Sequence, residues 1–170
     1  EKVHFILASF YWAQPSRGSV SGNSGSTTTT FSIPGEIGTN LYYQYYFKEN
    51  KLSLYSGYDF EKLNTFNTDQ IVTGASVTNI DNKIHYATFG ATKSFTLFNL
   101  NMNLKASVSK SITSSTSGTR ALAGTKYILY YTYKPEGLLS FSAFYKHHML
   151  SGTTKLAIDR IGFSVGVLVF

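Results

Sequence analysis

Residues 98–109 read FNLNMNLKASVS, and this stretch decides the predicted fold. Apolar and polar side chains alternate along it without interruption. The apolar members are Phe98, Leu100, Met102, Leu104, Ala106 and Val108. A period of two places each set on one face of a β-strand, whereas an α-helix would distribute both sets around its surface. The stretch therefore predicts a strand with one apolar face and one polar face.

The same alternation recurs along the chain and predicts about eight strands. It is regular in residues 121–133 and 139–149, and less regular in residues 33–47 and 52–60. Three further segments are expected to be strands whose facing stays open: 3–12, 83–92 and 160–170.

The connections between these segments are expected to alternate in length. Short turns are predicted at 48–50, near Lys93-Ser94, and at 135–137, where Pro and Gly favour a turn. Longer polar connections are predicted at 13–30, 62–82, 110–120 and 150–156. In an up-and-down sheet, this pattern places the long connections at one end. The short turns and both termini then lie at the other end.

Composition supports an all-β chain and excludes several classes of protein. Of the 170 residues, 16% are aromatic and only 14% are charged, against roughly 25% charged in a typical soluble domain. The absence of Cys excludes disulfides and thiolate metal sites. The net charge of +6 is carried by singly scattered Lys and Arg, so we expect no nucleic-acid partner. The length predicts one domain over residues 1–170.

The sequence is compatible with a membrane protein built from strands. Its longest apolar run, residues 127–131, is far shorter than the roughly 20 residues of a transmembrane helix, but a transmembrane strand needs only about 9–11 alternating residues. Aromatic residues collect near strand ends, as in the aromatic belts of membrane barrels, although they are also good strand formers. The strand pattern begins at Val3, so we expect a chain that is already processed or was never exported.

The segment 160–170 reads RIGFSVGVLVF. It resembles the last strand of bacterial outer-membrane β-barrels, an alternating segment with a terminal Phe that the assembly machinery recognises. The residues that carry this resemblance are Phe163, Val165, Val167, Val169 and Phe170. Phe170 has the opposite parity to the other four, whereas the family usually places its terminal Phe on their face. We therefore expect Phe170 to turn at the rim of the barrel.

With the alternating connections and the missing Cys, the whole chain is similar to the small eight-stranded outer-membrane barrels, such as the OmpA transmembrane domain, OmpX and OmpW. The resemblance implies an all-β, eight-stranded, antiparallel, up-and-down transmembrane β-barrel with short periplasmic turns and long extracellular loops. It also implies location in the bacterial outer membrane. The implied partners are outer-membrane lipid, lipopolysaccharide and the assembly machinery, and the barrel is expected to be a monomer.

Charged residues on the polar parity would face the interior of such a barrel. They are Glu36, Asp59, Glu61, Lys105, Lys126, Lys146 and Arg160, and His148 shares their parity. Side chains fill the interior of an eight-stranded barrel, and buried charges must pair. We therefore predict an ion-pair network that fills the lumen, with a narrow ion or water path as the alternative.

No catalytic, metal or cofactor site is predicted. Ser151, His147, His148 and Asp159 can be read as a hydrolase group, because one eight-stranded family member is a lipid acyltransferase with a His, Ser and Asp site. The chain has no nucleophile elbow, however, and adjacent His residues in a strand point to opposite faces. We predict a structural, surface-interaction or adhesive role. The alternatives are transport of hydrophobic compounds, as in OmpW, and a soluble lipocalin-like carrier.

Overall fold

The computed structural model describes residues 2–13, 16–21, 28–33, 36–66, 79–118, 120–134, 139–152 and 155–167. Within these residues the chain is all-β and forms ten strands. No helix in this part of the chain is long and apolar enough to cross a membrane. Eight strands form one antiparallel sheet, ordered β1 (Lys2–Ala13), β4 (Glu36–Phe47), β5 (Leu52–Phe66), β6 (Asn79–Leu97), β7 (Leu100–Thr116), β8 (Ala123–Lys134), β9 (Leu139–Ser151) and β10 (Lys155–Val167).

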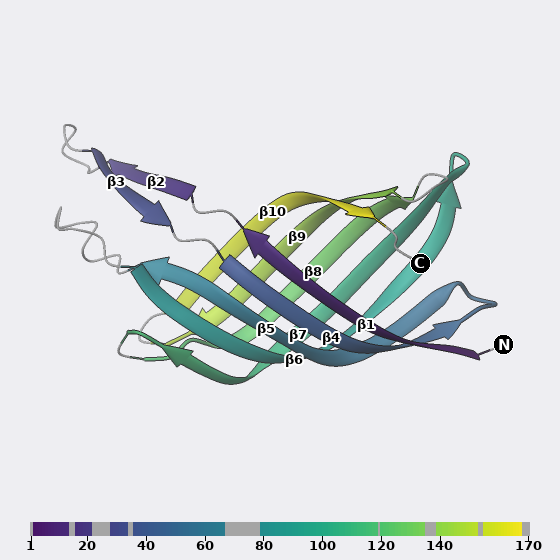
Figure 1. Ribbon diagram of the computed structural model, residues 1–170, viewed down its shortest axis with the longest axis horizontal. Coiled ribbons are helices and arrows are strands. Elements are labelled where there is room, and N and C mark those ends of the chain that lie inside the picture. The colour runs from purple at the N-terminus through teal and green to yellow at the C-terminus, as the bar shows by residue number, and fades with distance from the viewer. Residues whose placement is uncertain are drawn as a thin grey trace.

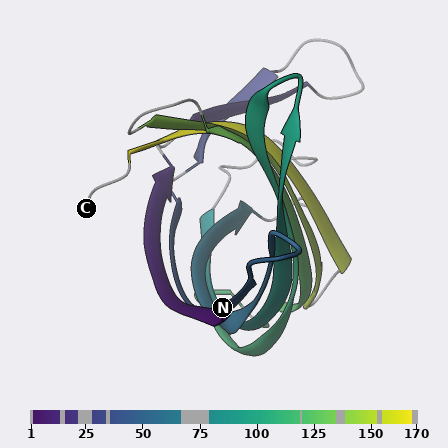
Figure 2. The same ribbon diagram turned by 90° about the vertical axis from the view of Figure 1, so that its right-hand side faces the viewer.

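The large sheet has up-and-down topology, because each of its strands pairs with the next of them along the chain. This part of the sequence prediction is confirmed. The sheet is strongly curved, so that it has a concave and a convex face (Figure 2). β2 (Ser16–Ser21) and β3 (Thr28–Ile33) form a separate two-stranded sheet between β1 and β4 in the chain. That hairpin lies beyond one end of the large sheet (Figure 1).

The sheet is not closed into a barrel, which differs from the sequence prediction. Among the described residues, β1 pairs with β4 alone and β10 pairs with β9 alone. Closure requires two edge strands to approach to about 4.7–4.9 Å so that their backbone groups form a ladder. Within the described residues, side-chain contacts alone join the two edge regions of the sheet, those of Arg160 with Glu36 and of Lys146 with Tyr11.

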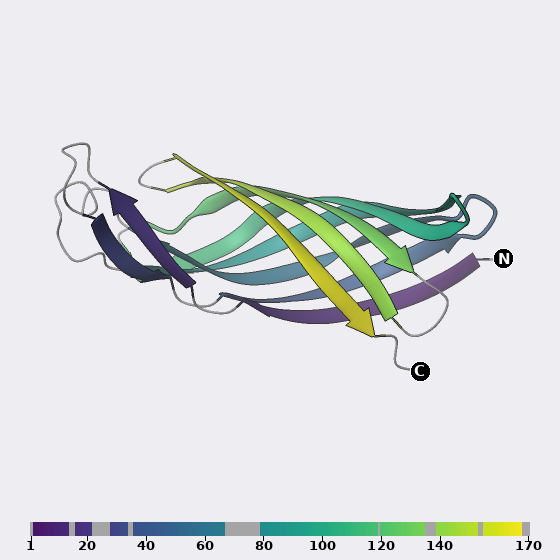
Figure 3. The same cartoon turned by 90° about the horizontal axis from the view of Figure 1, so that it is seen from above.

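The short turns, the start of β1 and the end of β10 lie at the same end of the sheet. Lys2 of β1 pairs with Phe47, and Val167 of β10 pairs with Leu139, so β1 begins and β10 ends beside the short turns. Figure 3 shows the start of β1 and the end of β10 at this end of the sheet. The predicted turn at 48–50 is confirmed, and the predicted turn at 135–137 lies outside the described residues. The connection after β9 spans only 152–154, so the predicted long connection at 150–156 is wrong.

The predicted turn near Lys93-Ser94 is also wrong. β6 continues to Leu97, which pairs with Leu100, and the hairpin turns at Phe98 and Asn99. These two residues have positive φ angles of 49° and 61°. A two-residue turn with positive φ at both positions matches the twist of its flanking strands, and Asn tolerates this conformation. The alternation that continues through Phe98 and Asn99 concealed the turn.

The strands extend further than predicted at the opposite end. β5 runs to Phe66, β6 begins at Asn79 and β7 runs to Thr116, so much of the predicted connections 62–82 and 110–120 is strand. β2 and β3 likewise occupy half of the predicted connection 13–30, and Ile33 ends β3 rather than starting β4. Polar residues on both faces give no alternation, but the backbone ladder to a neighbouring strand still forms.

The structure shows which side chains of β1, β6 and β10 lie on the concave face and which on the convex face, a question that the sequence left open. In β1, Ile6 and Phe10 are exposed on the convex face, whereas Tyr11 reaches a buried carboxylate on the concave face. In β6, Ile84 and Tyr86 are fully buried on the concave face. In β10, Ile161, Phe163 and Val165 are exposed on the convex face. The side chains of Val167, Val169 and Phe170 lie outside the described part.

The position of the β6–β7 turn can be tested by two Gly substitutions. Asn99→Gly is expected to raise the free energy of unfolding by up to about 1 kcal/mol, because Gly adopts positive φ without steric cost. Ser94→Gly should lower it by roughly 0.5–1 kcal/mol, because Gly weakens the interior of a strand. Urea unfolding measures both effects. If Asn99→Gly instead lowered the free energy of unfolding and Ser94→Gly raised it, the turn would lie at Lys93-Ser94.

Candidate functional site

Asp59 is the centre of one half of a polar cluster on the concave face. Its side chain is only 2% exposed. Tyr42 of β4 donates to Oδ1, and Thr88 of β6 and Lys126 of β8 donate to Oδ2 at 2.8 Å and 2.7 Å. Ser109 of β7 donates to Oδ2 at the longer distance of 3.4 Å. Asp59 therefore joins its own strand to β4, β6, β7 and β8.

Glu61 is the centre of the other half. Lys146 and His148 of β9 contact Oε1 and Oε2, each at 2.8 Å, and Lys126 contacts Oε1 at 3.2 Å. Tyr11 of β1 donates to Oε1 at 2.8 Å. The ammonium group of Lys126 thus lies between the two carboxylates. Together these groups extend the polar cluster from the first strand of the sheet to the strand next to the last.

Strand register explains why the cluster forms. Asp59 and Glu61 are two residues apart in β5, so they share one face. On the neighbouring strands, cross-strand pairs form a continuous row that runs across five strands: Thr88, Ser109, Lys126, His148 and Ile158. Because cross-strand neighbours on one face stand close together, the row presents hydroxyl, ammonium and imidazole groups to the curved interior.

Two side-chain contacts connect the two edge regions of the sheet, the one that contains β1 and β4 and the one that contains β9 and β10. Arg160 of β10 forms an ion pair with Glu36 of β4. Lys146 of β9 contacts the hydroxyl of Tyr11 in β1 at 3.1 Å and lies 4.5 Å from the centre of its ring. Both contacts join side chains across the unpaired edges of β1 and β10. The curvature of the sheet is therefore held from inside by polar side chains.

Lys105 differs from the other predicted lumen cations. In the described part of the chain it forms no ion pair, and its ammonium group lies over the rings of Tyr42, Tyr55 and Tyr130 at 5.0, 4.7 and 5.8 Å from their centres. Distances below about 6 Å are typical of cation–π contacts. Lys105 also lines a cavity of about 270 Å³, which the polar cluster borders.

An apolar cluster lies next to the polar cluster, towards the long connections. Its members come from β5, β6, β9 and the β7–β8 connection: Leu63, Ile84, Tyr86, Leu122 and Leu150, with Ile158 of β10 packed against them. Leu63 is two residues beyond Glu61, and Leu150 is two residues beyond His148, so both sets face the same interior. The apolar cluster separates the ion pairs from that end of the sheet.

The structure thus divides the seven charged residues predicted for the lumen into three groups. One cluster contains Asp59, Glu61, Lys126 and Lys146, and a separate ion pair contains Glu36 and Arg160. The ammonium group of Lys105 lies over tyrosine rings. Sequence reasoning missed the neutral donors to the two central carboxylates: Tyr11, Tyr42, Thr88 and Ser109. A cross-strand register was the only signal that could have placed them there.

The residues considered for a hydrolase do not assemble into one. His147 lies on the convex face, where its Nδ1 contacts Asp159 at 2.7 Å, whereas His148 is buried on the concave face against Glu61. Ser151 donates to the carbonyl oxygen of Ala123 at 3.3 Å. A nucleophile needs a base within hydrogen-bond distance, and the hydroxyl of Ser151 is directed elsewhere. Within the described ranges there is also no group of three or more His, Asp or Glu that could hold a metal ion.

Comparison with known proteins gives no further assignment: no protein-family model, curated protein or solved structure matches the chain.

The balance of the polar cluster can be tested at Lys126. Lys126→Met should lower the free energy of unfolding by about 3–5 kcal/mol, because it leaves two buried carboxylates with one ammonium partner fewer. Lys110→Met, on the exposed face of β7, should change it by less than about 0.5 kcal/mol.

Urea unfolding measures both variants, and adding Asp59→Asn to Lys126→Met should recover part of the loss, since the surplus charge is then removed. Equal effects of the two Lys substitutions would contradict a buried network.

Proposed function

We propose that the chain is an integral outer-membrane β-barrel with a structural or surface-interaction role and an interior filled by side chains. One observation carries the proposal: the polarity of the sheet is inverted relative to a water-soluble β protein. Among the described residues, eleven polar or charged residues are buried, against eight hydrophobic ones. The large apolar side chains are exposed instead, with Phe163 at 85%, Ile161 at 78% and Ile6 at 77%.

The exposed apolar residues form a band on the convex face. On β5 the band covers outward positions from Leu52 to Phe60, with the polar Ser56 between them, and on β7 from Leu100 to Val108, where Met102 is buried; this is nine residues in each case. Nine residues extend about 30 Å along a strand and about 21 Å along the membrane normal at a tilt near 45°. This height is close to the apolar band of roughly 25 Å that membrane barrels present to lipid.

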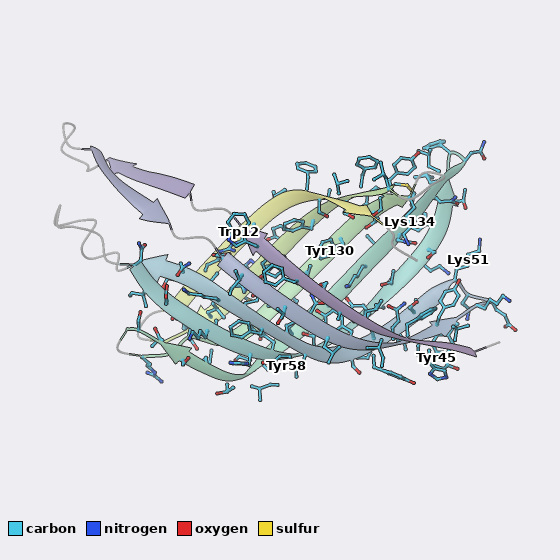
Figure 4. The ribbon with its side chains drawn as sticks, viewed as in Figure 1. Trp12, Tyr45, Lys51, Tyr58, Tyr130 and Lys134 are labelled. Atoms are coloured by element: carbon cyan, nitrogen blue, oxygen red, sulfur yellow. The ribbon has the colours of Figure 1, made fainter. Side chains whose placement is uncertain are left out.

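Polar residues end the band on successive strands. The first polar outward residues beyond it are Lys62 on β5, His85 on β6, Lys110 on β7, His147 on β9 and Asp159 on β10. His85 and His147 also contact tyrosines of the band, namely Tyr58, Tyr127 and Tyr145. A His and Tyr border of this kind is expected where hydrocarbon meets the polar headgroups. Trp12, near the same end of the sheet, has the same interfacial character (Figure 4).

In a bilayer, we propose that β1 and β10 pair and close the sheet. Unpaired backbone groups cost several kcal/mol each in hydrocarbon, so an open edge is not tolerated there. The contacts of Arg160 with Glu36 and of Lys146 with Tyr11 already join the two ends of the sheet from inside. Closure would add a backbone ladder between β1 and β10 to these side-chain contacts.

The interior favours a structural role over transport. Ion pairs and the apolar cluster occupy the concave face around a cavity of about 270 Å³, which charged side chains border. A soluble carrier of apolar ligands would instead present an apolar cavity and a polar outer surface. β2 and β3 lie beyond the proposed membrane band, which would place them outside the cell.

Membrane insertion can be tested with a matched pair of Arg substitutions. Leu129, 45% exposed on β8, lies within the band, whereas Ile112, 64% exposed on β7, lies beyond Lys110. In phospholipid vesicles, Leu129→Arg should lower the free energy of unfolding by about 2–4 kcal/mol, and Ile112→Arg by no more than about 1 kcal/mol.

The unmodified protein in dodecyl sulfate should also migrate differently before and after boiling, as a closed barrel does. Identical migration, together with equal effects of the two Arg substitutions, would favour a soluble protein.

A filled interior also predicts little or no steady ion conductance. The purified protein is expected to give no long-lived channel openings in planar bilayers, because side chains occupy an eight-stranded interior. Lys126→Met should remain silent as well, since the neighbouring side chains still fill the space. Large, lasting openings from the unmodified protein would replace the structural role with that of a pore.

A further inference from the structure

We propose that the cavity beside Lys105 is a binding site for a small oxyanion, a phosphate or a carboxylate. The proposal goes beyond the structural role and depends on the concave face rather than on the bilayer. It rests on a charge surplus around the cavity, on the saturation of the nearby carboxylates and on the surroundings of Lys105.

The charge surplus is visible in the lining of the cavity. Three ammonium groups border it, those of Lys105, Lys126 and Lys146, and two carboxylates, those of Asp59 and Glu61. Three positive and two negative charges leave one positive charge over. Lys126 and Lys146 are both paired with carboxylates at 2.7–2.8 Å. The surplus charge is therefore that of Lys105.

The two carboxylates are already saturated with donors. Asp59 accepts from Tyr42, Thr88, Ser109 and Lys126. Glu61 is contacted by Tyr11, Lys126, Lys146 and His148. A carboxylate offers about four lone-pair sites, so turning either group towards Lys105 would remove an existing partner. An acceptor for Lys105 has to come from outside the cluster.

The tyrosine rings around Lys105 do not supply this acceptor. Ring faces attract an ammonium group electrostatically, but they do not neutralise its charge. Three members of the cavity wall nearby carry hydroxyl groups, namely Ser107, Thr132 and Tyr130, and Ile128 opposite Ser107 is apolar. An ammonium group and several hydroxyls together form a donor-rich surface, which matches an oxyanion. A cation would meet the surplus positive charge, and an apolar molecule would leave the polar wall unpaired.

The cavity lies on the side of Asp59 that faces the short turns. Lys105 is paired across the sheet with Thr92 and Tyr130, whereas the apolar cluster begins at Leu63, beyond Glu61 in the other direction. The apolar cluster therefore closes one end of the interior, and the anion would enter from the end that carries the short turns. This arrangement makes the cavity a dead-end site, in agreement with the absence of conductance proposed above.

The experiment is a thermal unfolding series with inorganic phosphate at constant ionic strength, with chloride as the balancing anion. The detergent is a maltoside, because phosphocholine headgroups would compete for the site. At phosphate concentrations near 100 times the dissociation constant, the unfolding midpoint of the unmodified protein should rise by about 5–10 °C. A parallel series with acetate distinguishes a carboxylate ligand from a phosphate ligand.

Matched variants separate site binding from general salt effects. Lys105→Met should lose the anion-dependent shift, Lys105→Arg should keep it, and Lys110→Met, on the exposed face of the same strand, should leave it unchanged. If Lys105→Met does not fold, Lys105→Gln replaces it, and phosphate binding is measured by calorimetry. The proposal is overturned if neither anion shifts the unmodified protein relative to chloride, or if the shift persists without the charge of Lys105.

Discussion

The structure depends on the need to satisfy two carboxylates in the concave interior. Asp59 and Glu61 are 2% and 3% exposed, and an isolated buried charge would be too costly to keep ionised. Six strands supply the compensating donors: β1, β4, β6, β7, β8 and β9. This single requirement explains why residues far apart in the sequence face one interior and why the sheet curves around them.

Period-two alternation was enough to predict the eight strands of the large sheet and the inward parity of the charged residues, whereas the up-and-down order was implied by the family resemblance. It failed where alternation carries no information. Phe98 and Asn99 continue the apolar–polar pattern into a turn whose only signature is backbone conformation. Residues 113–116 have polar side chains on both faces, so the strand there is visible only in its ladder with β6.

The composition of the site was less predictable than its location. Parity placed Lys105, Lys126 and Lys146 on one face, but it did not distinguish the two ammonium groups in ion pairs from that of Lys105, which has no ion pair among the described residues. That difference depends on cross-strand register, because Lys126 stands opposite Ser109 and His148, whereas Lys105 stands opposite Thr92 and Tyr130. Register is a long-range property that a period of two does not encode.

The partners of Glu61 also constrain the order in which the chain can fold. Tyr11 and Lys146 are separated from Glu61 by 50 and 85 positions, and the contact between Arg160 and Glu36 spans 124. Contacts of such long range form slowly, because extended loops must close first. Until the first and the ninth strand arrive, the carboxylate of Glu61 needs water as its partner. If the chain entered hydrocarbon one hairpin at a time, the charge of Glu61 would enter before its partners were in place. Under the proposed membrane insertion, the buried carboxylate therefore favours a sheet that assembles almost completely before it enters the bilayer.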